Sequence, residues 1–186
     1  MMKIVLVTGG ARAGKSRWAE DEAGRIAGDE VVYVATAERG DEEMTARIAA
    51  HRASRPPGWI TVEAPLAVPE AVGAAEASVV LIDCVTVWVS NLMHALSAPE
   101  LDTEPVTDPR TPGDGVVSDH VEELLRTARA REGTLLVVTN EVGLGVVPDN
   151  ALARRYRDML GWVNARIARE AHRVLFLVAG LPMDVR

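Results

Sequence analysis

Short runs of branched apolar residues alternate with segments of helical periodicity along most of the chain. The apolar runs lie at residues 4–8, 31–35, 79–83, 135–139 and 174–178. Because these runs are continuously apolar rather than alternating, they indicate strands that are covered on both faces. The helical segments between them supply the crossover connections of a mainly parallel sheet. The pattern therefore predicts an α/β fold.

The segments between these strands carry the spacing of helices. They lie at residues 15–27, 42–53, 67–77, 85–96, 118–131 and 150–171. Residues 97–115 break the pattern, because they contain four prolines and several acids with almost no apolar periodicity. That composition favours a flexible surface loop, either a lid over a site or a disordered segment. We expect a single domain, residues 1–186, with this loop at residues 97–117.

Composition and net charge indicate which kinds of binding partner the protein can have. Hydrophobic residues make up 48% of the chain and charged residues 25%, as in packed globular proteins. The formal net charge of −7 argues against nucleic acid as a partner, because a nucleic-acid binder normally presents a concentrated basic face. The single cysteine, Cys84, is typical of a small buried residue in a reducing compartment. With no signal-peptide pattern and no apolar stretch near the ~20 residues of a membrane span, we expect a cytoplasmic protein without membrane insertion.

The segment after the first predicted strand carries the clearest chemical signature. It matches Gly-x-x-x-x-Gly-Lys-Ser and opens a predicted helix, which is the context that a P-loop requires. Its residues are Gly9, Gly10, Ala11, Arg12, Ala13, Gly14, Lys15 and Ser16. The glycines let successive backbone N–H groups point at phosphate oxygens, and the start of the helix adds its positive end. Lys15 would neutralise the β- and γ-phosphates of ATP or GTP, and Ser16 would ligate Mg²⁺.

An acidic residue ends the predicted strand at residues 79–83. In P-loop proteins a second strand ends in an acid that holds Mg²⁺, directly or through water, and Asp83 stands at that place. The alternative is that Asp83 caps the helix that begins at Val85. Together the two motifs predict a P-loop NTPase-like (RecA-like) fold with helices on both faces of the sheet. A signalling GTPase is disfavoured, because Asn-Lys-x-Asp is absent, so a metabolic transferase is the better hypothesis.

Further motifs follow in order along nearly the whole chain. They are residues 8–16, 33–37, 41–44, 47–52, 55–56, Trp59, Glu63, 83–86, 90–92, 139–150, Arg154, 157–158 and Asn164. They resemble the bifunctional adenosylcobinamide kinase/adenosylcobinamide-phosphate guanylyltransferases of cobalamin assembly. The segments at 47–52 and 139–150 are the specific ones, since a P-loop alone indicates only a superfamily. The chain departs from the family in Ala13, where serine is usual, in Ala50, where a second histidine is common, and in its expanded segment at 97–115.

The resemblance implies two reactions. The first phosphorylates the terminal hydroxyl of adenosylcobinamide, and the second transfers GMP from GTP to that phosphate through a guanylylated histidine. The position of that histidine matches His51, and neutral imidazole suits the role because its N–P bond stays reactive. From spacing alone, His51 would instead be a structural histidine half buried behind Met44 and Ile48. His51 and Lys15 are thus the expected catalytic residues.

The same resemblance implies the nucleotide site. Its expected residues are Val34, Ala35 and Thr36, then Arg52, Ala53, Ser54 and Arg55 beside His51, with Glu63 and Asp83 contacting guanosine or metal. Ser16 and Asp83 are the expected metal ligands, and Glu141 is a candidate to orient the cobinamide hydroxyl. The arginines at residues 154–157 either receive phosphate or form ion pairs on a helix face. The four tryptophans either flank the corrin ring or anchor the core.

Other assignments stay open beside this one. The resemblance implies a homotrimer, which composition and periodicity do not address. A simple P-loop kinase for another small alcohol would leave His51 structural, with no covalent intermediate. A nucleotide-gated regulatory protein is the third hypothesis, and the lack of switch signatures counts against it. The kinase step could use ATP or GTP.

Overall fold

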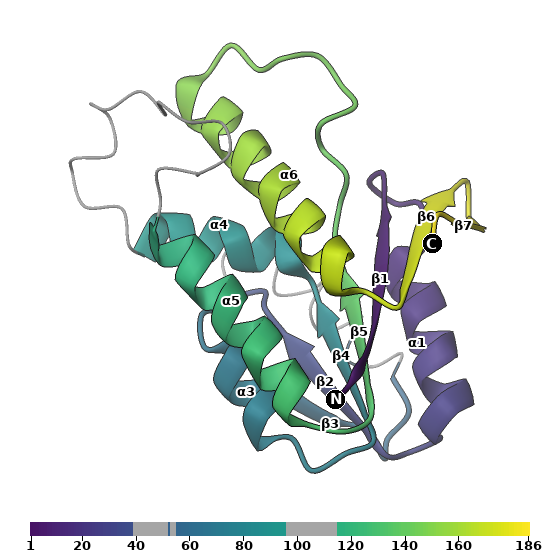
Figure 1. Cartoon of the computed structure of the whole chain (residues 1–186). Coiled ribbons are helices and arrows are strands. Elements are labelled where there is room, and N and C mark those ends of the chain that lie inside the picture. Colours follow the sequence, from purple (N-terminus) through teal and green to yellow (C-terminus); the bar gives the residue numbers. More distant parts are fainter. Residues whose placement is uncertain (39–51, 53–54, 96–114) are drawn as a thin grey trace.

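A seven-stranded sheet forms the centre of the computed structural model, which describes residues 1–38, 52, 55–95 and 115–186 (Figure 1). The strands are β1 (Lys3–Gly9), β2 (Val31–Ala35), β3 (Ile60–Glu63), β4 (Val79–Asp83), β5 (Thr134–Val138), β6 (Arg173–Val178) and β7 (Leu181–Asp184). Their order is β3-β2-β4-β5-β1-β6-β7. All neighbours are parallel except β7, which pairs antiparallel with β6. The predicted mainly parallel α/β sheet is confirmed.

The described helices cover both faces of the sheet, as expected. They are α1 (Lys15–Ala27), α3 (Val68–Ala74), α4 (Val85–Ala95), α5 (Gly115–Ala130) and α6 (Ala151–Glu170). Helix α1 lies on one face, and the other four lie on the opposite face (Figure 1). No described helix is both long enough and apolar enough to cross a bilayer.

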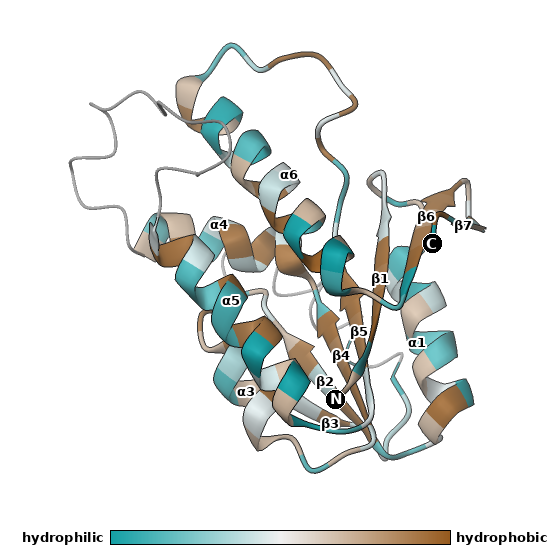
Figure 2. Cartoon of the chain, in the orientation of Figure 1, coloured by the Kyte–Doolittle hydropathy of each residue, from teal (hydrophilic) through white to brown (hydrophobic). Residues whose placement is uncertain are grey.

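Alternate residues of each central strand enter two separate apolar layers. Leu81 packs against the α1 side with Ala19 and Ala23, whereas Ile82 packs into the layer under the four helices with Trp88. This follows from the two-residue period of a strand, whose successive side chains point to opposite faces. Figure 2 accordingly shows the inner strands as hydrophobic along their length, while the helices carry polar residues on their outer sides.

The two edge strands, β3 and β7, were not predicted from the sequence. Strand β3 has four residues, and both of its end residues, Ile60 and Glu63, are exposed. Strand β7 is exposed at every position and contains Pro182. Proline has no N–H to donate and is therefore confined to sheet edges. Edge strands bury too little apolar surface to produce the continuous runs by which the inner strands were predicted.

Helix boundaries also differ in places. Helix α5 begins at Gly115 rather than at residue 118, because Val117 is already buried in the core, so residues 115–117 do not belong to the predicted loop. The rest of that loop, residues 97–114, lies outside the described residues. So does the predicted helix at 42–53, apart from Arg52. Helix α3 ends at Ala74, three residues early, because Ala75 is extended.

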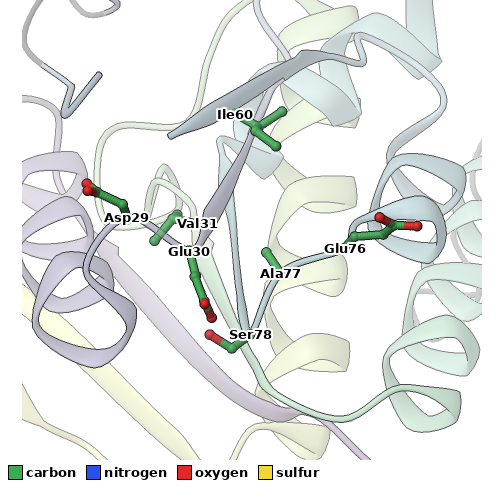
Figure 3. A pocket seen from close by; sticks show the side chains of 7 residues that line it. All are labelled: Asp29, Glu30, Val31, Ile60, Glu76, Ala77 and Ser78. Carbon is green, nitrogen blue, oxygen red and sulfur yellow. The ribbon is translucent and has the colours of Figure 1, made fainter. Parts of the chain in front are cut away.

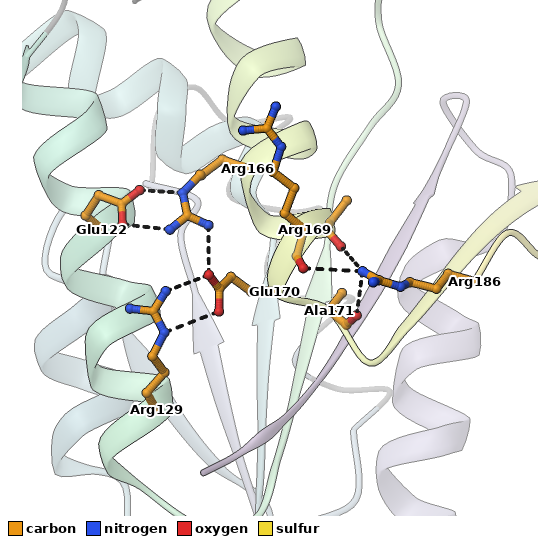
Figure 4. Close-up of polar contacts among 8 residues, drawn as sticks. Glu122, Arg129, Arg166, Arg169, Glu170, Ala171 and Arg186 are labelled. Atoms are coloured by element: carbon orange, nitrogen blue, oxygen red, sulfur yellow. Dashed lines mark hydrogen bonds and ion pairs between the residues drawn. The ribbon is translucent and has the colours of Figure 1, made fainter.

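Ion pairs join the last two helices, α5 and α6, on their outer side (Figure 4). Arg166 of α6 donates to both carboxylate oxygens of Glu122 on α5, and Arg129 of α5 donates to both oxygens of Glu170 on α6. Arg166 also reaches Glu170 at 3.2 Å. Arg186 donates to three carbonyls at the end of α6, among them that of Ala171 at 3.3 Å. These contacts fix the end of α6 relative to α5 and to Arg186, whose carbonyl accepts from the N–H of Val174 on β6.

Candidate functional site

The loop between β1 and α1 has the backbone that the P-loop motif requires. Gly9 has φ 148°, and a Cβ built there would lie 2.5 Å from the carbonyl oxygen of Leu177 on β6. Gly14, directly before α1, has φ 91°, in the left-handed region that favours glycine. The loop therefore needs glycine at both places to pass beside β6 and enter the helix.

Lys15 lies at the first position of α1, pointing back over this loop. Its side chain is 7% exposed, and its Nζ donates to the carbonyl of Gly10 at 2.6 Å. Burial lowers the pKa of Lys15, and the neighbouring Cys84 and Asp83 oppose that effect. A buried ammonium beside backbone N–H groups at a helix start is suited to an anion.

Three strands bring the next predicted residues to the same edge of the sheet. Ala35, the last residue of β2, pairs with Asp83 on β4 and with Glu63 on β3. The carboxyl ends of parallel strands are where open α/β sheets bind ligands. Asp83 and Glu63 thus lie on either side of Ala35 at this carboxyl edge.

Asp83 is held by a tyrosine that the sequence analysis did not single out. The hydroxyl of Tyr33 donates to Asp83 Oδ2 at 2.6 Å. The guanidinium of Arg55 lies 3.3 Å from the centre of the Tyr33 ring, and its Nη1 donates to Thr61 at 3.1 Å. Burial first, and then the negative charge of Asp83, raise the pKa of Tyr33, so that its hydroxyl stays a donor.

Glu20 of α1 is a second group that the sequence analysis missed. Its Oε1 is buried and has no hydrogen-bond partner among the described residues. Burial raises the pKa of Glu20, Asp83 raises it further, and Arg55 opposes both. Its position on α1 offered a signal, because Glu20 lies three residues before Ala23 and so borders the buried face that Lys15, Ala19 and Ala23 mark.

The segment after β5 lies against the phosphate loop. The backbone N–H of Glu141 donates to the carbonyl of Gly9 at 3.0 Å. Asn164 of α6 holds this segment through the carbonyl of Asn140 at 2.9 Å and the hydroxyl of buried Thr139 at 2.7 Å. The Glu141 carboxylate accepts from the N–H of Gly143 at 2.7 Å. Glu141 is therefore beside the loop, with its side chain bonded within its own segment.

The remaining predicted nucleotide residues occupy different environments. Val34 and Thr36 are fully buried, and the Thr36 hydroxyl bonds both the N–H and the carbonyl of Cys84 at 2.9 and 2.8 Å. Only their backbone could contact a nucleotide. Arg52 and Glu63 are exposed and face each other at 3.9 Å. His51, Ala53 and Ser54 lie outside the described residues.

Comparison with known proteins identifies the family. Residues 5–185 match the family model described as cobinamide kinase / cobinamide phosphate guanyltransferase. The chain belongs to this family. The bifunctional adenosylcobalamin biosynthesis protein CobP of Pseudomonas aeruginosa is 44% identical over 97% of this chain and 96% of its own length. The CobU protein of Salmonella typhimurium, of the same description, is 36% identical over 98% of this chain and 99% of its own.

The resemblance drawn from the motifs is thus confirmed, and with it the enzyme class of a bifunctional kinase and guanylyltransferase. Among solved structures, the ATPase domain of G40P superposes with a TM-score of 0.51 at 14% identity, covering 95% of this chain and 69% of that one. At that identity the likeness concerns the fold alone. It confirms the P-loop NTPase-like architecture.

Arg154 and two of the tryptophans serve structure in the described part of the chain. Arg154 donates to the carbonyls of Pro148 and Asp149, at 2.9 and 2.6 Å, so it fixes the start of its own helix. Trp59 and Trp88 are buried, and their indole N–H groups donate to the carbonyls of Gly28 and Leu66, each at 2.9 Å. The reading of these two tryptophans as core anchors is confirmed.

A hollow also opens at the opposite edge of the sheet (Figure 3). It is lined by Asp29, Glu30, Val31, Ile60, Glu76, Ala77 and Ser78, around the amino ends of β2, β3 and β4. Figure 3 shows carboxylates of Asp29, Glu30 and Glu76 around it. An acidic rim repels phosphate, and the edge is the one that α/β sheets do not use for ligands. The candidate site is therefore at the carboxyl edge, around Lys15 and Asp83.

Proposed function

We propose that this chain phosphorylates the terminal hydroxyl of adenosylcobinamide and then transfers GMP from GTP to the product, through a guanylylated His51, in cobalamin biosynthesis. The observation that supports it best is the buried Lys15 over a glycine-bent loop at the sheet edge that carries Asp83. Family membership supplies the substrate class. The homotrimer, the cytoplasmic location and the absence of a nucleic-acid partner stay predictions.

The nucleotide triphosphate binds over the loop from Gly9 to Ser16. The backbone N–H groups of this loop and the positive end of α1 stabilise the negative charge of the phosphates. Lys15 exchanges its hydrogen bond to the Gly10 carbonyl for bonds to phosphate oxygens, which are stronger acceptors. Transfer of a phosphoryl group needs positioning and charge neutralisation more than covalent help. This loop would serve GTP and ATP alike, because a P-loop binds the phosphates and not the base.

The donor set at this edge fits Mg²⁺. Among the described residues there is no group of three or more His, Cys, Asp or Glu side chains that could hold a metal ion. Mg²⁺ suits such a site, because it is held by one or two protein oxygens together with substrate phosphates and water. Ser16 would supply a hydroxyl and Asp83 a carboxylate, and the bound ion would neutralise charge on the phosphates.

Glu141 is the candidate to orient the acceptor hydroxyl in the kinase step. Its backbone is bonded to Gly9, so its carboxylate needs only to exchange the N–H of Gly143 for the substrate hydroxyl. A carboxylate at this place would accept the hydroxyl proton as the oxygen attacks the γ-phosphorus and the bond from that phosphorus to the leaving nucleoside diphosphate breaks.

The guanylyl transfer proceeds in two steps, each a nucleophilic substitution at the α-phosphorus. An imidazole nitrogen of His51 attacks the α-phosphorus of GTP, an N–P bond forms, and the bond to pyrophosphate breaks. A phosphate oxygen of the phosphorylated corrinoid then attacks the same phosphorus and releases the histidine. Arg52 and Arg55, one and four residues along the chain, would balance the negative charge of the triphosphate.

GTP labelled on its α-phosphate tests this function. We expect acid-labile label on the protein that is lost in His51→Ala, and a product with the mass of adenosylcobinamide-GDP. His120→Ala is the matched control, since His120 lies on α5 with its Nδ1 against the carbonyl of Val116 at 2.9 Å. Turnover of adenosylcobinamide without any protein label would leave only the simple kinase. Label retained in His51→Ala would place the nucleophile elsewhere.

A further inference from the structure

A row of polar contacts crosses the face of the sheet that α1 covers. It runs from Thr61 on β3 to Arg55, then to Tyr33 on β2, and ends at Asp83 on β4. The three contacts measure 3.1 Å from Arg55 Nη1 to Thr61 Oγ1, 3.3 Å from Arg55 Cζ to the ring centre of Tyr33, and 2.6 Å from the Tyr33 hydroxyl to Asp83 Oδ2. We call these residues the Tyr33 row.

The register of the strands explains why Tyr33 reaches Asp83. Tyr33 pairs with Thr61 on one side and with Leu81 on the other. Asp83 lies two residues beyond Leu81 and so points to the same face, at the diagonal distance that an aromatic side chain can span. Tyr33 is 2% exposed and packs with Leu81 and Val31, which leaves its hydroxyl little freedom.

Tyr33 is contacted at the face of its ring and at its hydroxyl. Arg55 stacks on the face of the ring, an attraction between a cation and the negative face of an aromatic group. Thr61 fixes Arg55 in turn. The hydroxyl is therefore held by packing and stacking before it meets the carboxylate, so the hydrogen bond fixes Asp83 rather than Tyr33.

We propose that Tyr33 is a positioning residue for Asp83: its hydroxyl holds the carboxylate in the orientation that receives Mg²⁺ with the bound nucleotide. This inference rests on the proposed function, because it takes Asp83 as the metal ligand. Groups that hydrogen-bond a metal-binding side chain fix its direction, and their loss typically weakens metal affinity ~10–100-fold. Tyr33 needs no contact with the nucleotide to act in this way.

Tyr33→Phe tests the inference, because it keeps the ring and the Arg55 stack and removes only the hydroxyl. GTP affinity would be measured by calorimetry over a series of Mg²⁺ concentrations and in EDTA. We expect the Mg²⁺ concentration that gives half of the effect on affinity to rise ~10-fold. Affinity in EDTA is expected to stay unchanged, which a general loss of structure would not allow.

Tyr156→Phe is the matched control, since Tyr156 is the other tyrosine of the chain and its hydroxyl donates to the Thr86 carbonyl at 3.0 Å. It should leave the Mg²⁺ midpoint unchanged. Added to Asp83→Asn, the Tyr33→Phe change should have no further effect, because both act on one contact.

Three results would overturn the inference: a normal Mg²⁺ midpoint in Tyr33→Phe, an equal shift in Tyr156→Phe, or additive effects of Tyr33→Phe and Asp83→Asn. Failure of the proposed function looks different. In that case a Lys15→Met protein would keep its full GTP affinity, whatever the behaviour of Tyr33.

Discussion

The layer between the sheet and the helices α3, α4, α5 and α6 is apolar almost throughout, whereas charged and hydroxyl side chains interrupt the layer under α1 toward the carboxyl edge. Under the four helices, the buried polar pair Thr139 and Asn164 is mutually hydrogen-bonded. Under α1, Glu20 Oε1 and Arg55 Nε are buried with no hydrogen-bond partner in the described chain.

The contrast between the two layers indicates that one stabilises the fold and the other contains the polar groups of the candidate site. Unpaired buried polar groups cost free energy, and native proteins keep few of them. Glu20 and Arg55 both lie beside the Tyr33–Asp83 pair, as expected of a region shaped for a ligand rather than for stability. The layer under the four helices carries the apolar burial that offsets this cost. Substitutions in the two layers should therefore affect different measurements.

Trp88→Ala is the substitution with the largest expected effect on the apolar layer. Trp88 is fully buried and donates its indole N–H to the carbonyl of Leu66, so truncation leaves a cavity and removes one of two hydrogen bonds to that carbonyl, which also accepts from the N–H of Val68. We expect the free energy of unfolding in urea to fall by about 3–5 kcal/mol. The folded fraction should keep its GTP affinity. Trp88→Phe, which fills more of the space, should lose less, and an equal loss in both would show that cavity volume does not matter there.

Lys15→Ala should behave in the opposite way. Turnover should fall ~10²–10³-fold, as when one group that stabilises transition-state charge is removed. Stability should change by less than about 1 kcal/mol, since the lost hydrogen bond to Gly10 is offset by relief of a buried charge. Lys15→Met keeps the apolar stem and separates charge from packing. A variant as active as the parent protein would remove the main support for the P-loop assignment.

The inner strands and the phosphate loop were predictable because each carries a local pattern. Continuous apolar runs mark strands buried on both faces, and Gly9, Gly14 and Lys15 stand at fixed spacing. Strands β3 and β7 lacked such a pattern, since they are short edge strands with exposed side chains. The sheet order follows from long-range pairing and is not a property of any one segment.

The site was predictable only where a motif marked it. Tyr33 begins the motif at residues 33–37, but it also lies within an apolar run and is therefore typical of a core residue, so the motif did not reveal its role. Its contact with Asp83 depends on the register of β2 against β4. The same register buries the side chains of Val34 and Thr36, which the resemblance alone assigned to the nucleotide pocket. The spacing of residues along the chain does not show which side chains of neighbouring strands face each other.

The smallest expected effect is at the C-terminal ends of the helices that cover the two layers. Helix α1 ends at Ala27 and is followed by Gly28, whose N–H donates to the carbonyl of Gly24, while at the end of α6 the side chain of Arg186 also donates to the last carbonyls (Figure 4). A cation at a helix C-terminus contributes about 0.3–1 kcal/mol, mostly through the last carbonyls. Arg186→Ala should therefore lower the free energy of unfolding by that amount, with the loss decreasing at high salt.

Arg17→Ala is the control for Arg186→Ala. Arg17 is 88% exposed and its pair with Asp21 spans 4.0 Å, so its removal should change stability little. Because Arg186 acts on the side of the sheet opposite α1, its loss should leave GTP affinity at the carboxyl edge as it was. A drop in affinity without a drop in stability would show that α6, through Asn164 and the Asn140 carbonyl, transmits its position to the phosphate loop.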